Sequence, residues 1–337
     1  MLSMTLPELK ALMQTVSEPQ YRADQIFSWL HAKGAVNFSQ MTNIPAKLRD
    51  KLNNKAQINS CVISQKQQSK TDGTVKYLFA ANSTDYIESV VMRHSYGNSI
   101  CVSSQVGCAM GCVFCASAQG GFVRNLTAGE MLSQLYEAEK DLNIKISNVV
   151  IMGTGEPMLN YAAVLRFTAL LTAKEGKNIS ERSITLSTCG IVPKILDLAK
   201  RGVKLNLAVS LHSANDSKRA QIMPGASAYS VRELADSAEF YFSKTGRRVT
   251  WEYMLLNGIN DYGEDALLLA KLLKGKNTHV NIINYNKTNS NLFSASRNTQ
   301  EFIALLTQNG INATLRKSMG SDIDGACGQL RAKKAQY

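Results

Sequence analysis

The sequence predicts an α/β fold: a full or partial (β/α) barrel preceded by a small N-terminal helical accessory domain and a β extension. Three observations lead to this prediction. Residues 1–57 show helical periodicity, and residues 58–93 change to the two-residue alternation of strands. In residues 94–337, short apolar runs alternate with amphipathic segments of helical length. Repeated strand–helix units of this length indicate a parallel sheet with helices packed outside it.

The helical domain, residues 1–57, is predicted from apolar residues that recur every three or four positions around Leu9, Ile26 and Leu48. Basic residues are interleaved with them: Lys10, Arg22, Lys33, Lys47, Arg49, Lys51 and Lys55. This pattern suits an accessory module that faces a nucleic acid. A domain that only packs against the rest of the protein would show it equally well.

The β extension, residues 58–93, is predicted to be a small antiparallel sheet. Asp72-Gly73 is a turn signal between the strand-like segments 64–67 and 75–79. The segment Tyr86–Met92 is expected to be a third strand. We expect this extension to join the helical domain to the barrel.

The barrel is predicted from the strand and helix patterns of residues 94–337. The predicted strands are 100–104, 148–152, 183–187, 203–210, 248–255, 279–284 and 312–315, and the predicted helices are 127–141, 161–174, 192–201, 230–243, 263–273 and 299–309. Thr127 and Glu130 form a capping-box pattern that starts the first of these helices. In barrels of this kind the functional site gathers at the C-terminal ends of the strands. The candidate residues there are Gly153–Pro157, Ser187–Gly190, Ser210-Leu211-His212 and Asn286.

Size, charge and hydropathy narrow the possible classes of protein. The chain has 337 residues, of which 45% are hydrophobic, as expected for a globular protein. No apolar run is long enough to span a membrane, and the N-terminus lacks the pattern of a signal peptide. A cytoplasmic location is therefore expected. The net charge of +12 favours a polyanionic partner, although a basic surface without a partner is the alternative.

Cys108, Cys112 and Cys115 form a C-x3-C-x2-C pattern just after a predicted strand. Three thiolates can hold an iron–sulfur cluster of the cubane type, which takes four ligands, and leave one iron open to a small molecule. Gly107 and Gly111 would let the backbone wrap closely around such a cluster. A zinc site is the alternative, but it needs a fourth Cys or His at a suitable spacing.

Five segments are distinctive when they are taken together. They are Cys101–Cys115, Gly121–Thr127, Gly153–Pro157, Val209–His212 and Asp324–Leu330. Together they resemble the radical S-adenosylmethionine (SAM) superfamily, and within it the RlmN-type adenine-C2 RNA methyltransferases. The resemblance covers nearly the whole chain, and it implies a partial barrel of the radical SAM type.

The resemblance implies the cofactors and their ligands. Cys108, Cys112 and Cys115 would hold a [4Fe-4S] cluster, whose open iron binds the amino and carboxylate groups of SAM. The other SAM ligands would be Gly155, Glu156, Ser187, Ser210, Leu211, His212 and Asn286. Without the resemblance, Ser187 would pass as an ordinary serine at a strand end and His212 as a structural histidine. Two SAM molecules would be used in each turnover.

The resemblance also implies three catalytic residues. Cys327 would be methylated by one SAM and carry the methyl group as a thioether. A radical from a second SAM would activate this group for addition to C2 of adenine. Cys101 would then break the bond to Cys327 by forming a disulfide, and Glu88 would remove the C2 proton. On their own, Cys327 would look like an inert buried thiol and Glu88 like an ordinary strand carboxylate.

The substrate implied by the resemblance is an adenosine of 23S ribosomal RNA in the peptidyl-transferase region, with an adenosine beside the tRNA anticodon as a second candidate. A flavodoxin-like electron donor, no membrane and a monomeric state are expected. Two alternatives stay open. Cfr-type relatives methylate C8 of adenine, although Pro157 favours C2. A non-catalytic RNA-binding protein with a structural metal centre would explain the charge and the cysteine trio, but not Cys101, Cys327 or the Gly153–Pro157 loop.

Overall fold

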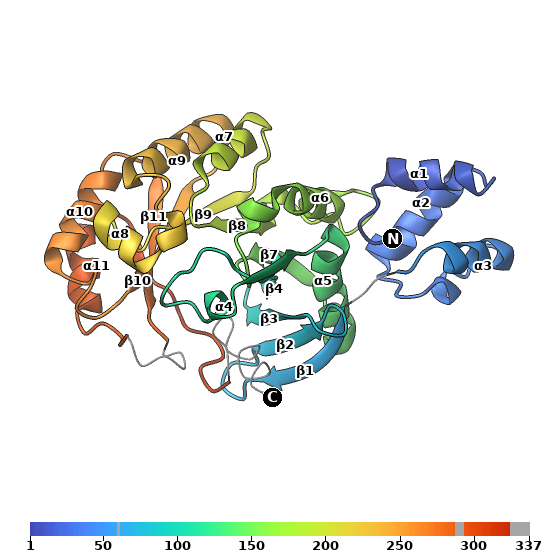
Figure 1. Cartoon of the computed structure of the whole chain (residues 1–337), viewed down its shortest axis with the longest axis horizontal. Helices are drawn as coiled ribbons and strands as arrows, with labels where there is room; N and C mark the ends of the chain where they lie inside the picture. The colour runs from blue at the N-terminus through green and yellow to red at the C-terminus, as the bar shows by residue number, and fades with distance from the viewer. Residues whose placement is uncertain (59–60, 287–292, 324–337) are drawn as a thin grey trace.

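The computed structural model describes residues 1–58, 61–286 and 293–323. Its core is a ten-stranded sheet that curves into a partial barrel (Figure 1). In spatial order the strands are β1 (Val62–Gln68), β2 (Val75–Ala80), β3 (Tyr86–His94), β4 (Gly97–Cys101), β7 (Ile146–Ile151), β8 (Ile184–Thr188), β9 (Asn206–Ser210), β10 (Val249–Leu255), β11 (Thr278–Asn284) and β12 (Ala313–Leu315). Pairing is antiparallel from β1 to β4 and parallel from β4 to β12. The predicted α/β class is confirmed.

The strands of the β extension continue the barrel sheet at one edge, because β3 pairs with β4. The turn expected at Asp72-Gly73 joins β1 to β2. β4 ends at Cys101, whereas the sequence pattern predicted a strand that reached Ser104. The prediction was wrong because Ser103 leaves the strand ladder: its hydroxyl donates to the Glu88 carbonyl, and its N–H donates to the Gln134 side chain.

Helices that follow the parallel strands cover the outer side of the sheet (Figure 1). They are α5 (Ala128–Leu142), α6 (Tyr161–Thr172), α7 (Val192–Lys200), α9 (Val231–Thr245), α10 (Gly263–Leu273) and α11 (Thr299–Gln308). The predicted capping box is present: the Thr127 hydroxyl accepts the Glu130 N–H, and the Glu130 carboxylate accepts the Thr127 N–H. Side chains of β10 alternate, so Tyr253 packs against Phe302 of α11 while Glu252 lies on the inner face.

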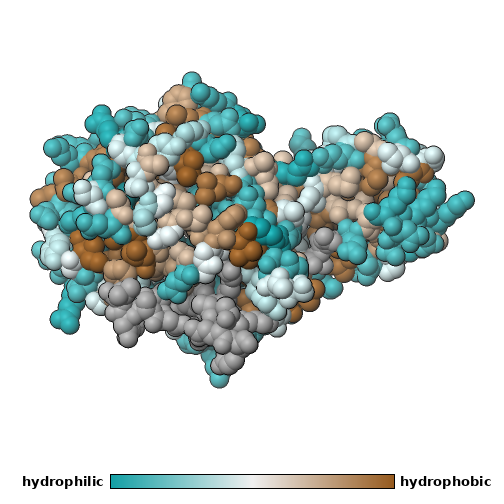
Figure 2. All heavy atoms as spheres, in the orientation of Figure 1, coloured by the Kyte–Doolittle hydropathy of each residue, from teal (hydrophilic) through white to brown (hydrophobic). Residues whose placement is uncertain are grey.

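The N-terminal region is helical, as predicted. Its helices are α1 (Leu6–Thr15), α2 (Tyr21–Phe27), which continues as a π-helical turn, and α3 (Ala46–Lys55). They lie beside α5 and α6 (Figure 1). The Ser3 hydroxyl accepts a hydrogen bond from the Gly129 N–H at the start of α5, and Glu8 pairs with Arg166 of α6 at 2.6 Å. Figure 2 shows hydrophilic side chains over the end of this region that is farthest from the barrel.

Four short elements around the site were not predicted. They are β5 (Gln105–Gly107), α4 (Ala116–Gln119), β6 (Phe122–Asn125) and α8 (Asp216–Ile222). Each is too short for a hydrophobic period to develop. β5 and β6 pair in a separate two-stranded sheet, which frames the cysteine loop between them. Within the described ranges, no helix is long and apolar enough to cross a membrane.

Candidate active site

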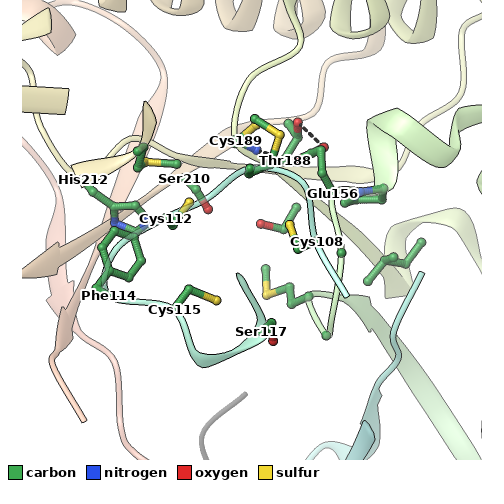
Figure 3. Close-up of a pocket in the computed structure, with 18 residues that line it drawn as sticks. Cys108, Cys112, Phe114, Cys115, Ser117, Glu156, Thr188, Cys189, Ser210 and His212 are labelled. Atoms are coloured by element: carbon green, nitrogen blue, oxygen red, sulfur yellow. Dashed lines mark hydrogen bonds between the residues drawn. The ribbon is translucent and has the colours of Figure 1, made fainter. Parts of the chain in front are cut away.

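The loops that follow β5, β7, β8 and β9 meet around one cavity (Figure 3). The cavity is lined by eight of the predicted cluster and SAM ligands: Cys108, Cys112, Cys115, Gly155, Glu156, Ser187, Ser210 and His212. These residues are far apart in the chain, and the parallel sheet brings the ends of their strands to the same edge. The predicted cluster ligands and most of the predicted SAM ligands therefore share one space.

The cysteine loop is shaped by the β5–β6 hairpin that surrounds it. The Cys108 N–H donates to the Gly121 carbonyl at 2.9 Å, and this closes the base of the loop. Gly107 has a φ of 75°, and a Cβ at this position would lie only 1.8 Å from the Gly121 oxygen. Only glycine fits both the conformation and the contact. The predicted need for glycine at this position has a physical basis in the structure.

The three thiols of the cysteine loop all line the same cavity. A cubane cluster spreads its thiolates over several irons, and three thiols around one space suit such a cluster. Burial raises the pKa of Cys108 to about 11 and that of Cys112 to about 12. A bound metal centre would supply the positive charge that keeps such thiols deprotonated.

Glu156 is buried beside Thr188 and Cys189 (Figure 3), and its carboxylate accepts three hydrogen bonds. The donors are the Met158 N–H at 2.9 Å, the Thr188 hydroxyl at 2.7 Å and the Cys189 N–H at 2.7 Å. Burial raises the pKa of Glu156, and these hydrogen bonds oppose the shift. The carboxylate thus ties the loop after β7 to the loop after β8. The sequence suggested Glu156 and the segment Ser187–Gly190, but it did not predict that Thr188 and Cys189 donate to the Glu156 carboxylate.

Arg219 on α8 is a residue of the site that the sequence did not single out. It is almost fully buried, and its guanidinium donates to the carbonyls of Leu211, Ala226 and Cys189 at 3.2, 2.6 and 2.5 Å. Its five donors can satisfy several carbonyls at once. Arg219 thereby fixes the loops after β8 and β9 relative to each other.

His212 lies at the end of β9 with its ring in the cavity, next to Phe114 of the cysteine loop (Figure 3). Its backbone φ is 55°, an unfavourable value for a residue with a side chain. The Met254 N–H donates to its Nδ1 at 2.9 Å, and burial lowers the pKa of His212 to about 3. The ring is therefore neutral with its proton on Nε2, which makes Nε2 a hydrogen-bond donor at the cavity.

Leu211 and Asn286 do not line this cavity. Leu211 is fully buried, and its N–H donates to the Glu252 carbonyl on β10, so it acts through its backbone. Asn286 is exposed just after β11, next to residues 287–292, which lie outside the described part of the chain.

Glu88 and Cys101 lie on neighbouring strands, outside the lining of this cavity. Glu88 of β3 forms a buried ion pair with Lys76 of β2 at 3.0 Å. Lys76 and Cys101 both pair with Val90 of β3, one from each side, so the three residues form a row across the sheet. Burial raises the pKa of Cys101 to about 11, and the nearby cation Arg316 partly opposes this.

Cys327 lies outside the described residues, but the chain that leads to it is held against the β1–β2 turn. Asp322 accepts hydrogen bonds from the Ser69 hydroxyl at 2.5 Å and from the Lys70 N–H at 2.8 Å. Asp72 accepts the Gly320 N–H at 2.8 Å. The described part of the C-terminal segment thus returns to the turn between β1 and β2, and β2 pairs with β3, the strand that carries Glu88. All six described cysteines are free thiols, so the expected disulfide is not supported by the described residues.

Comparisons with known proteins decide the family. Two family models match: the Ribosomal RNA large subunit methyltransferase N-terminal domain over residues 1–58, and the Radical SAM superfamily over residues 102–273. A protein of Lachnoclostridium phytofermentans described as a dual-specificity RNA methyltransferase RlmN is 47% identical over 331 residues, which cover 98% of this chain and 93% of that protein. This chain belongs to the RlmN family. An RlmN relative from Clostridium perfringens is 48% identical over 98% of this chain and 96% of its own.

A solved structure of the same fold agrees with this assignment. The crystal structure of a radical SAM methyltransferase from Sphaerobacter thermophilus has a TM-score of 0.94 and 40% identity, and the match covers 98% of this chain and 99% of that one. The resemblance seen in the sequence is confirmed. As a member of the RlmN family, the protein is a radical SAM RNA methyltransferase, and its superfamily implies a [4Fe-4S] cluster and SAM as cofactors.

Proposed function

We propose that this protein methylates C2 of an adenosine in the peptidyl-transferase region of 23S rRNA, and also an adenosine beside the anticodon of tRNA. The relatives described as dual-specificity RNA methyltransferases support two classes of RNA substrate. The net charge of +12 suits either one. The observation that carries the proposal is the shared cavity, where three thiols lie beside Gly155, Ser210 and His212.

The cavity would hold both cofactors. When bound, the cluster would supply the electron for reductive cleavage of SAM, and SAM would supply the methyl group. Cys108, Cys112 and Cys115 would bind three of the irons. Since the Glu156 carboxylate already accepts three hydrogen bonds, Gly155 and Glu156 would meet the amino group of SAM through their backbone.

The remaining predicted SAM ligands would act as hydrogen-bonding groups. The hydroxyls of Ser187 and Ser210 and the Nε2–H of His212 are available at the cavity wall. Leu211 would contribute its backbone, which is already fixed by its bond to Glu252. Asn286 would approach the cofactor from the loop after β11. The ring of Phe114, packed edge-on against His212, would shield the site from water.

The one-carbon unit would reach RNA through Cys327. One SAM would methylate the Cys327 thiolate, and a second would be cleaved to activate the resulting thioether, so each turnover would use two. Cys101 would then attack the sulfur of Cys327. The S–S bond forms as the bond from the Cys327 sulfur to the transferred carbon breaks, and that carbon keeps the electron pair and takes up a proton to become the methyl group of the released base. Glu88 would accept the proton from C2, and the ion pair with the Lys76 ammonium at 3.0 Å would orient its carboxylate.

The test is to identify the methylated nucleoside. Anaerobically reconstituted protein is incubated with 23S rRNA fragments and tRNA, SAM and a reductant, either dithionite or a flavodoxin, and the RNA is then digested for mass spectrometry. We expect 2-methyladenosine from both RNAs, and none with Cys112→Ala. If 8-methyladenosine forms instead, the enzyme methylates C8, as Cfr-type relatives do, and the proposed C2 specificity is wrong. Cluster-loaded protein that cleaves SAM but methylates neither RNA would refute the proposal.

A further inference from the structure

A second cavity, of about 690 Å³, lies on the inner face of the barrel sheet next to the candidate active site. Met152, just after β7, lines both cavities and marks the border between them. The other strands show the same order: Ser187 and Ser210 line the first cavity, and Thr185 and Ala208, two residues earlier, line the second. The second cavity therefore extends from the cofactor site towards the N-terminal ends of the parallel strands.

Glu252 of β10 offers a buried carboxylate to this cavity. Only 4% of its surface is exposed. Its Oε1 accepts a hydrogen bond from Asn281 at 3.0 Å, whereas its Oε2 makes none within the described chain and lies 3.5 Å from an Arg316 nitrogen. A buried oxygen without a donor is costly, so the site is suited to a ligand that brings an N–H group.

Glu252 contacts both cavities: its side chain lines the second cavity, and its backbone binds the loop that lines the first. Its backbone carbonyl accepts the N–H groups of Leu211 and His212 at 3.0 and 3.3 Å. A ligand held by the Glu252 side chain would thus lie beside the same loop that lines the cofactor site. Contact with Met152 would bring it to the shared border.

The far end of the cavity is basic. Arg247 and Arg248 precede β10 and line the cavity, and Arg248 is exposed to solvent. One Arg247 nitrogen donates to Asn206, but its buried Nε has no partner among the described residues. Arg248 lies four positions before Glu252, which corresponds to roughly 13 Å along an extended strand. Cationic guanidinium groups at this end suit a phosphate, which they bind through paired N–H donors.

We propose that this cavity receives the target adenosine nucleotide. The exocyclic amine of the base, the donor on adenine, would bind Glu252 Oε2, while a phosphate of the same nucleotide would bind Arg247 and Arg248. Carboxylates accept from the amines of nucleobases, and enzymes that modify a base take it out of its stack into such a pocket. This assignment rests on the proposed function and adds to it the groups that select adenine.

The first test measures base selectivity without any turnover. AMP and purine riboside 5′-monophosphate, which lacks the amine, are titrated into the cluster-loaded protein, and binding is followed by calorimetry. The protein should prefer AMP by about tenfold or more, because the analogue leaves the buried Glu252 Oε2 without a hydrogen-bond donor. Glu252→Gln should lose most of this preference. Asp265→Asn is the matched control, since Asp265 is equally buried but pairs with Lys218 on the helical side.

The second test concerns the phosphate end. The double variant Arg247→Gln, Arg248→Gln should bind AMP only about as well as adenosine, and its AMP affinity should depend less on salt. Arg201→Gln is the control, because Arg201 is an exposed arginine on the outer surface, paired with Asp197. Thermal melting shows whether either variant is unfolded.

A cross-linking experiment uses the unaltered protein and so does not depend on the folding of a variant. An RNA hairpin carrying 8-azidoadenosine should cross-link to the peptide of residues 246–255.

The outcomes separate this inference from the proposed function. Equal binding of AMP and the purine analogue, AMP binding unchanged by Glu252→Gln, or cross-links only outside the cavity would each overturn the inference. If RNA is methylated at C2 under those outcomes, the proposed function stands without it. If adenine-selective binding is seen but no methylated adenosine forms, the inference stands and the proposed function fails.

Discussion

Replacing Glu156 by glutamine tests whether its carboxylate ties two loops together or only binds SAM. Oε1 accepts from Met158 and Thr188, and Oε2 accepts from Cys189. A glutamine can keep the two bonds at one oxygen, but its amide N–H then faces the Cys189 N–H. A buried donor left without an acceptor costs about 1–3 kcal/mol. Glutamine also removes the buried negative charge, whose burial raises the pKa of Glu156, and this gain offsets part of the cost. We therefore expect the free energy of unfolding to fall by about 2 kcal/mol.

The assay is thermal unfolding of the protein before cluster and SAM are loaded. In a chain of this size, about 2 kcal/mol lowers Tm by roughly 3 °C. Thr188→Val removes only one of the hydrogen bonds and should give a smaller fall, of about 1 kcal/mol. If Glu156→Gln leaves the unfolding temperature of the unloaded protein unchanged and weakens only SAM binding, the carboxylate is a SAM ligand, and the account of it as a tie between loops is wrong.

Three further predictions concern the loop, the C-terminal segment and pH. Gly107→Ala should lose most of the bound iron after reconstitution, because its Cβ would collide with the Gly121 carbonyl. The control Gly202→Ala has a similar φ but open space around it and should retain iron. Equal iron contents in the two variants would contradict this argument. Asp322→Ala should raise the rate of amide hydrogen exchange in residues 316–323 about tenfold or more, because two hydrogen bonds are lost. An exchange rate no higher than in the exposed control variant Asp50→Ala would contradict this prediction. The pKa of His212 is about 3 in the folded protein, compared with 6.5 in the unfolded chain. As pH falls, the unfolded state therefore binds a proton first, and the free energy of unfolding decreases from about pH 6.5 downward. The decrease amounts to roughly 2 kcal/mol at pH 5. The unfolding free energy of unloaded His212→Asn should therefore differ less between pH 7 and pH 5; an unchanged difference would refute the assignment.

Much of the barrel could be predicted because its signals are local. Thr127 and Glu130 mark the start of α5 within four residues of sequence, and the apolar runs of β7 and β8 identify buried strands without knowledge of their neighbours. The position of candidate residues at the ends of these strands then follows from the rule for parallel sheets. The eight residues around the first cavity could be placed together for this reason.

The rest depends on contacts between distant parts of the chain. Arg219 holds three carbonyls from different loops, and no local pattern distinguishes it from a surface arginine. The Glu156 carboxylate is engaged by donors 32 and 33 residues away, so its role as a tie between loops could not be read from the Gly153–Pro157 motif. Similarly, the pairing of Lys76 with Glu88 requires the register of two strands, which the sequence did not give.

The central claim is that Cys327 carries the methyl group and that the group loses a hydrogen atom before it reaches RNA. It is tested most directly by supplying SAM whose methyl group is fully deuterated to the cluster-loaded protein with substrate RNA. The account predicts an RNA methyl group that retains only two of the three deuterium atoms, with the third found in 5′-deoxyadenosine. Transfer of all three deuterium atoms to adenine would contradict it.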